Sequence, residues 1–314
     1  MNIRHSITGI MTLCAVTLTA TVSAQTTAPK ITGYVKTDYS SNLKDSEAFN
    51  VSNARLKVAG DVSEQTSYVI FFDTVRDDVL LDAYVSHDIL PFLTISAGQF
   101  KTPYSTDNLL SSAKLAFINR PYLKSDASPA LRDKGVKLTL KQGMFTADIA
   151  AMNGSGQNKS ENNTNKSFST RVVGAVLPGL SISGNYYHGI NNADGEADDF
   201  INIGVNGTVG SFEYSGEFAQ KDHNGLTGNA MFAWVSYDLE TGFAAIPLLV
   251  PALRIEQSDP NTDIDDNARS RYTASVSANF GKKFSDRVMI NYEVREVQTG
   301  DADDQFGIEY IVSF

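Results

Sequence analysis

The chain has 314 residues, a formal net charge of −10 at pH 7 and a single cysteine, Cys14. The negative charge argues against broad nucleic-acid binding. Beyond residue 24, no stretch offers the run of about 18 nearly uncharged apolar residues that a membrane-spanning helix needs.

Residues 1–24 have the pattern of a secretory signal peptide. A short polar start at Arg4 precedes a mostly apolar stretch, and Val22, Ser23 and Ala24 provide the small residues of a cleavage site. An uncleaved anchor is the alternative. The predicted mature chain, residues 25–314, contains no cysteine, so we expect neither disulfides nor thiol chemistry. An exported chain without a spanning helix is periplasmic, secreted or an outer-membrane barrel.

The mature chain contains sixteen strand-like segments, most of which alternate polar and apolar residues with period two. They cover approximately 31–39, 51–61, 66–74, 79–88, 92–101, 133–141, 144–152, 167–177, 180–190, 200–209, 211–221, 229–239, 246–256, 268–280, 287–297 and 305–314. Segment 246–256 fits least well, because Pro251 lies in its middle and proline cannot donate to a strand ladder. A bulge at Pro251, or different boundaries, is therefore expected.

The segment lengths are close to the 9–11 residues or so of a tilted strand that crosses a bilayer. A sheet in hydrocarbon must close, because an open edge would leave backbone groups unpaired. The connections alternate short and long along the chain, as the periplasmic turns and outer loops of outer-membrane barrels do. We therefore predict an all-β fold, a transmembrane antiparallel β-barrel of about 16 strands, with both termini on the periplasmic side.

The last strand adds a more specific signal. Phe306, Ile308, Tyr310, Val312 and the terminal Phe314 share one face. This pattern resembles the C-terminal strand that the barrel-assembly machinery of Gram-negative bacteria recognises. A soluble β-sandwich ending on an aromatic strand is the alternative interpretation.

The longest connection, residues 102–132, is predicted to be a constriction loop that folds into the pore. Loops of this length inside a compact domain are usually functional or disordered, and the apolar residues of this one favour packing. It is also basic within an acidic protein, since residues 101–134 hold six cations against three carboxylates. The predicted constriction residues are Lys101, Lys114, Arg120, Lys124, Arg132 and Lys134.

The polar strand faces of such a barrel line its lumen. Closure would make the last four predicted strands and the first two a contiguous wall. That wall carries seven predicted lumen cations, the basic arc: Lys36, Arg55, Lys57, Arg254, Arg269, Arg271 and Arg295. Opposite a basic loop, this arc would produce a positive constriction of the kind that favours anions. The alternative is that these cations pair with lumen carboxylates and only solvate the wall.

Three outer connections favour cations rather than anions. Segments 191–199, 257–267 and 298–304 carry eleven carboxylates and no lysine or arginine, and an acidic mouth attracts cations at low salt. The aspartates of segment 257–267 lack the glycine and distant glutamate of an EF-hand, so no metal site is expected.

The three mature histidines lie at strand ends or in a loop, and no Gly-x-Ser-x-Gly motif occurs. We therefore expect no enzymatic activity and no cofactor.

Several short motifs between residues 51 and 155 occur in a defined order: ARLKVAGD at 54–61, LDAY at 81–84, GQFKTPY at 98–104, LAFINR at 115–120, RDKGV at 132–136 and MNG at 152–154. This ordered set resembles the phosphate-selective porin O and P family of Gram-negative bacteria. The resemblance implies a sixteen-stranded barrel, a homotrimer, an inward third long loop, and anion conduction along pore lysines and arginines. Arg55, Lys101, Arg120 and Arg132 fall within the matching motifs.

The combined expectation is a passive outer-membrane porin for small hydrophilic solutes, with a preference for anions such as phosphate. The alternatives are a non-selective or cation-preferring porin, and a structural or adhesive barrel whose lumen is plugged. The expected partners are outer-membrane lipid and lipopolysaccharide, the barrel-assembly machinery through Phe314, small anions and two further copies of the chain, but no nucleic acid.

Overall fold

The computed structural model describes residues 28–314 except 162, 191–196 and 300–301. The predicted signal peptide, residues 1–24, lies outside the described residues. Within them, none of the helices has the length and apolar character required to cross a membrane.

Seventeen β-strands make up nearly all of the described secondary structure, and each of the sixteen predicted segments overlaps one of them. The strands are β1 (Lys30–Ser41), β2 (Glu47–Asp61), β3 (Thr66–Asp73), β4 (Leu80–Leu90), β5 (Leu93–Lys101), β6 (Arg132–Gln142), β7 (Phe145–Met152), β8 (Ser167–Leu177), β9 (Leu180–Ile190), β10 (Ala197–Val209), β11 (Phe212–His223), β12 (Leu226–Tyr237), β13 (Leu239–Phe243), β14 (Ile246–Asp259), β15 (Arg269–Asn279), β16 (Asp286–Val297) and β17 (Gln305–Ser313).

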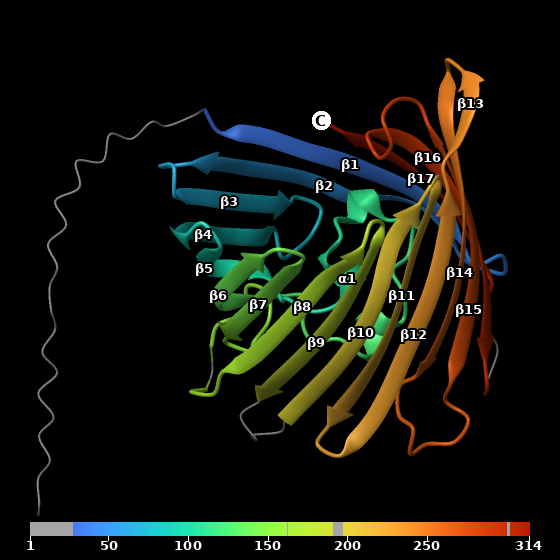
Figure 1. Ribbon diagram of the computed structural model, residues 1–314. Helices are drawn as coiled ribbons and strands as arrows, with labels where there is room; N and C mark the ends of the chain where they lie inside the picture. Colours follow the sequence, from blue (N-terminus) through green and yellow to red (C-terminus); the bar gives the residue numbers. More distant parts are fainter. Residues whose placement is uncertain (1–27, 162, 191–196, 300–301) are drawn as a thin grey trace, which may run out of the picture.

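The strands form one closed antiparallel barrel (Figure 1). Each strand pairs with its neighbour in sequence, and β17 closes the ring by pairing with β1, with Tyr34 opposite Ser313. β12 and β13 both pair with β14 and continue the same line of the wall. The wall is therefore sixteen strands around, as predicted.

The alternation along the strands separates a lumen face from an outer face. In β15, Arg271, Thr273 and Ser275 are buried inside the barrel, whereas the alternate residues Tyr272 and Val276 are exposed on the outside. A polar inner face and an apolar outer face are what a barrel in a lipid bilayer requires, because lipid contacts only the outside.

The prediction of a bulge at Pro251 is wrong. The pairing of β14 with β15 runs without a register shift through Pro251 and its partner Val276. On the other side of β14, pairing with β12 ends at Ala252, and β13 takes over from Leu249. On this side, Pro251 lies where the partner strand changes from β12 to β13, a place where a residue without a backbone N–H is tolerated.

Candidate functional site: the inner loop and its two cavities

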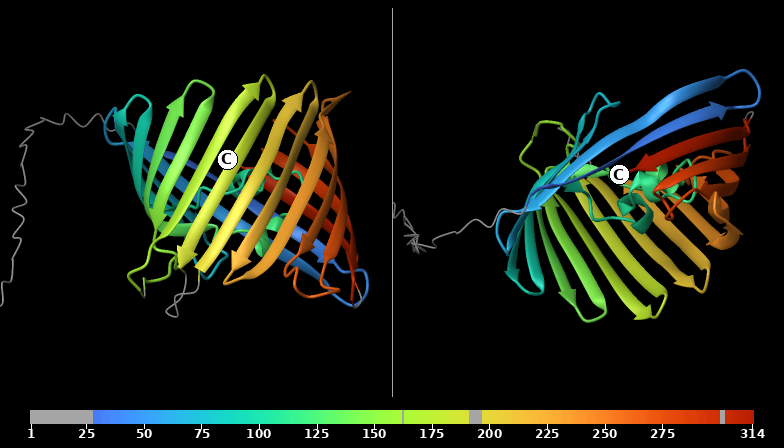
Figure 2. Two further views of the ribbon diagram at one scale, coloured as in Figure 1. Left: turned by 60° about the horizontal axis from the view of Figure 1, so that its bottom comes forward. Right: turned by 90° about the horizontal axis from the view of Figure 1, so that it is seen from above.

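Residues 102–131 connect β5 to β6 through the interior of the barrel (Figure 2). This inner loop contains two short helices and one 3-10 turn: α1 (Thr106–Leu109), η1 (Ser112–Lys114) and α2 (Leu123–Asp126). Ser105 caps α1 by accepting a hydrogen bond from Asn108 N at 3.2 Å. The loop therefore has its own local structure, and the wall determines where that structure sits.

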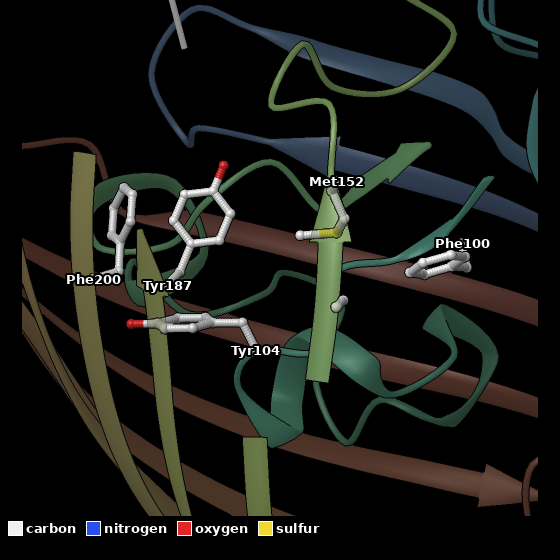
Figure 3. Packing of buried hydrophobic residues seen from close by; sticks show 6 residues of the cluster. Phe100, Tyr104, Met152, Tyr187 and Phe200 are labelled. Carbon is white, nitrogen blue, oxygen red and sulfur yellow. The ribbon is translucent and has the colours of Figure 1, made fainter. Parts of the chain in front are cut away.

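The start of the inner loop is fixed by an aromatic cluster on the lumen face of the wall (Figure 3). Tyr104 packs edge-on to Phe200 with ring centroids 6.2 Å apart, and Tyr187 also packs edge-on to Phe200 at 5.7 Å. Met152 of β7 completes the same cluster. Burial raises the pKa of the Tyr104 hydroxyl above its ordinary value, as expected for a phenol removed from water.

The second half of the loop packs in an apolar contact site, the seat of α2, on the neighbouring strands β11 and β12. Leu123 and Ala127 are fully buried against Ala219, Ala230 and Phe232. The two wall alanines have small side chains, which leave room for the α2 helix to approach the strands closely. Next to this seat, Phe117 meets Trp234 edge-on at 6.3 Å.

Three buried wall arginines hold the backbone of the loop by donating hydrogen bonds to its carbonyl oxygens. Arg254 Nη1 donates to Asn119 O at 2.7 Å, and Arg271 Nη2 donates to Arg120 O at 2.7 Å. Arg287 Nη2 donates to Leu115 O at 2.7 Å. These loop-anchoring arginines, Arg254, Arg271 and Arg287, are all nearly inaccessible to solvent.

Three wall carboxylates complete the attachment by accepting from the loop. Glu217 Oε1 accepts from Asp107 N at 2.7 Å, and Glu256 Oε2 accepts from Tyr122 N at 2.6 Å. Glu293 Oε1 accepts from the amide side chain of Asn119 at 3.0 Å. Because both donors and acceptors of the wall reach the loop, the loop is hydrogen-bonded to the wall at many points along its length.

The basic arc is contiguous wall, as predicted, but its charges are mostly compensated. Six of its seven cations have a carboxylate partner: Lys36 with Glu309, Arg55 with Asp73, Arg254 and Arg271 with Glu256, Arg269 with Asp126, and Arg295 with Glu293. The exception is Lys57, for which the described part of the chain shows no ion pair.

The predicted constriction residues divide into paired and unpaired groups. Arg120 is 3.0 Å from Asp107 within the loop, and Arg132 is 2.8 Å from Asp82 on the wall. Lys101 Nζ donates to two loop carbonyls, Asn108 O at 2.8 Å and Leu110 O at 2.7 Å.

The other three lysines differ in position. Lys114 and Lys124 are exposed on the inner loop, and among the described residues neither has an ion pair. Lys134 lies on β6 and donates to Lys159 O at 2.8 Å in the next outer connection. Although the Lys124 side chain reaches solvent, the protein packed around it disfavours the charged form, and this desolvation, followed by the charges of Arg120 and Arg76, lowers the pKa of Lys124.

Two cavities border the inner loop, and their charges differ. The inner cavity has a volume of 240 Å³ and is lined by four cations, Arg55, Lys101, Arg132 and Lys137, against one carboxylate, Asp82. The vestibule, 640 Å³, lies beside the ends of β1 and β17. Its lining has three cations against four carboxylates: Lys36, Arg269 and Arg295 against Asp38, Glu293, Asp303 and Glu309.

Sequence reasoning missed Arg287 and the role of Glu217. Both follow the period-two pattern, since Arg287 shares the inner face of β16 with Glu293 and Arg295. The alternation could therefore have placed Arg287 in the lumen. It could not have revealed that the loop carbonyls lie within reach. Among the described residues, no group of three or more His, Cys, Asp or Glu is arranged to hold a metal ion.

A family model described as phosphate-selective porin O and P matches residues 30–244, more than half of the chain. The chain belongs to this porin family. It is an outer-membrane porin, a channel protein rather than an enzyme. A comparison with curated protein sequences found no significant match.

Solved porin structures share the fold at low sequence identity. An anion-selective porin from Comamonas acidovorans is 15% identical, with a TM-score of 0.70 over 91% of this chain and 99% of that one. The trimer form of OmpT from Vibrio cholerae is 12% identical, with a TM-score of 0.68 over 91% and 99%. OprB from Pseudomonas putida is 10% identical, with a TM-score of 0.66 over 91% and 94%. At these identities the likeness concerns the barrel fold.

Proposed function

We propose that this porin passes small hydrophilic solutes by passive diffusion and favours anions such as phosphate at the inner cavity. The observation that carries this proposal is that Lys101 and Lys137 line the inner cavity without a carboxylate partner among the described residues. The other two lining cations, Arg55 and Arg132, are compensated by Asp73 and Asp82. Rings of arginine and lysine are the usual means by which pores favour anions.

The geometry of the inner cavity strengthens the effect of its few charges on a permeating solute. It is narrow, and the inner loop and the apolar Phe71, Tyr84 and Phe100 form part of its lining. Low-dielectric walls concentrate the potential of charges that face a confined aqueous space. A solute is therefore filtered by size where the loop narrows the lumen, and by charge at the same place.

The vestibule supports the competing hypothesis of a cation-preferring porin. Its carboxylates outnumber its cations by one, and the outer segments add further acidic residues, although 191–196 and 300–301 lie outside the described residues. We favour the anion preference because two unpaired lysines line the inner cavity, whereas the carboxylates of the vestibule exceed its cations by one. A plugged structural or adhesive barrel is the second competitor, since the loop fills much of the lumen.

The remaining features complete the proposal. Residues 1–24 would direct export and be removed, residues 25–314 would form the barrel, and 102–132 would be its constriction loop. Phe314 would present the last strand to the barrel-assembly machinery, and the mature barrel would contact lipid and lipopolysaccharide. A homotrimer is supported by the trimeric form of the structurally similar Vibrio cholerae protein.

Planar-bilayer recording tests the function directly. Purified mature protein is recorded across a KCl gradient, with and without phosphate, beside Lys137→Gln and the control Lys282→Gln, which changes an exposed lysine in a short turn. We expect an anion-signed reversal potential, interference by phosphate, and a shift toward cations only in Lys137→Gln. A cation-signed wild-type potential would favour the acidic vestibule. Absence of conductance from folded protein would indicate a plugged barrel.

A further inference from the structure

We infer that the three loop-anchoring arginines are positioning residues for selectivity: they hold the inner loop in place and do not themselves attract the permeating anion. This inference deepens the proposed function and rests on it for its electrical readouts. Arg254, Arg271 and Arg287 lie on β14, β15 and β16, whereas the wall residues of the inner cavity lie on β2 to β6, and none of the three arginines lines it.

Charge compensation is the first argument. Arg271 Nε is 2.6 Å from Glu256 Oε1 and its Nη1 is 3.3 Å from Glu293 Oε2. Arg254 Nε is 3.0 Å from the same Glu256 oxygen. A guanidinium so closely paired presents little net charge to a solute in the lumen. These two side chains are also almost completely buried, so a solute has no surface to contact.

Hydrogen-bond geometry is the second argument. Arginine carries several donors in a planar fork, so one side chain can pair with a carboxylate and still donate to a backbone carbonyl. Arg254 and Arg271 do this at two adjacent loop residues, Asn119 and Arg120. Their aromatic contacts reinforce the seat, since Arg254 lies 4.6 Å from the ring centre of Phe117.

Arg287 is the clearest of the three, because it has no carboxylate in an ion pair among the described residues. Its Nη2 donates to Leu115 O at 2.7 Å and Ala113 O at 3.3 Å, and its guanidinium lies 5.0 Å from the ring centre of Phe284. Burying a charge without a counter-ion is costly unless its donors are satisfied. The loop carbonyls accept both hydrogen bonds of Nη2, whereas Nε has no hydrogen-bond partner among the described residues. Displacing the loop would leave the buried guanidinium with still fewer partners, so the arginine and the loop stabilise each other.

The chain contains a natural reporter for this attachment. Trp234 is the single tryptophan, and it contacts Phe117, two residues after Leu115. Arg287 lies on β16 and Trp234 on β12, with two strands between them in the wall. A change at Arg287 should therefore reach the fluorescence of Trp234 through the loop.

The experiment compares Arg287→Lys and Arg287→Gln with the lumen variant Lys57→Gln. The lysine variant keeps the charge, but its ammonium ends one bond short of the position of the arginine Nη2. We expect both Arg287 variants to shift Trp234 emission to the red and to raise single-channel conductance, because the loop is released. In Lys57→Gln, the emission should stay at the wild-type value and the reversal potential should move toward zero.

The opposite pattern would overturn the inference. If Arg287→Lys behaves like wild type and Arg287→Gln changes only the reversal potential, the charge itself acts on the solute. Unchanged emission and conductance in both variants would equally refute the anchoring role. Heat-modified migration in gels verifies that each barrel is folded, and Arg271→Lys replaces any Arg287 variant that is not. A wild-type barrel that does not conduct would refute the proposed channel while the Trp234 comparison still tests the attachment.

Discussion

Arg271 and Glu256 form a buried ion pair on the lumen wall, with Nε and Oε1 2.6 Å apart. The same glutamate accepts the backbone N–H of Tyr122 at 2.6 Å through its other oxygen. The ion pair is therefore joined to the inner loop by a hydrogen bond. Its charges compensate each other, and its remaining donors and acceptors fix the position of the loop.

Removing the charge of Glu256 should destabilise the barrel strongly. Glu256→Gln leaves Arg254 and Arg271 without their shared partner, and breaking a buried pair on one side typically costs about 3–5 kcal/mol. Urea unfolding in detergent micelles measures the free energy of unfolding. Glu240→Gln on the exposed hairpin is the matched control and should change it by less than about 0.5 kcal/mol. Equal stability of the two variants would contradict the role of the pair.

The seat of α2 should depend on the volume of Leu123. Leu123→Ala removes a buried side chain that packs between Ala219 and Phe232, and such truncations cost about 2–5 kcal/mol. We expect faster amide hydrogen exchange at Ala127, whose N–H donates to Leu123 O at 3.1 Å. Leu43→Ala, in an exposed outer loop, is the control. Unchanged exchange would show that the arginines alone hold the loop.

Charge reversal of paired and unpaired loop cations should have different consequences. Arg120→Glu with Arg132→Glu places new carboxylates beside Asp107 and Asp82, so both the anion preference and the stability should fall. Lys114→Glu with Lys124→Glu changes two exposed side chains and should shift the reversal potential toward cations at nearly wild-type stability. If the first double variant keeps its reversal potential, the inner loop does not control selectivity.

The lowered pKa of Lys124 predicts a pH dependence. Folding disfavours the charged lysine, so the penalty on stability is fully present below the lowered pKa and disappears as pH rises through the ordinary lysine value. The anion preference should accordingly begin to fall at a lower alkaline pH than an unperturbed lysine would give. Reversal potentials recorded from neutral to alkaline pH measure this. Lys124→Gln should remove that early change, and its persistence would assign the titration to another group.

Much of the barrel could be predicted from the sequence, because a membrane-spanning strand alternates inward and outward side chains. Period-two alternation placed Arg271 and Thr273 inside and Tyr272 outside, and the structure confirms it. The strand ends were less accurate. The region before β14 shows why: β13 (Leu239–Phe243) fell, apart from Leu239, in the connection between the predicted segments 229–239 and 246–256, because Glu240, Thr241 and Gly242 give no alternating apolar pattern.

The candidate site was partly predictable. The length, basic charge and apolar residues of segment 102–132 identified a loop that packs inside the barrel. Sequence reasoning assigned Arg254 and Arg271 to an electrostatic field, whereas their contacts make them anchors. The difference between these two roles depends on which groups face the two arginines. Whether these arginines meet a loop carbonyl oxygen depends on residues 135 and 151 positions away in the sequence.

The sequence by itself determined the strand pattern, the closed barrel and the identity of the long basic loop, because these depend on local alternation and on the backbone's need for hydrogen bonds. Only the tertiary structure decided which cations are neutralised and which remain to act on a solute. Lys101 and Lys137 line the inner cavity while Arg271 is buried against Glu256. Charge compensation is a matter of distances of a few ångströms between side chains on paired strands, and those distances exist only after the strands have paired in register in the closed wall.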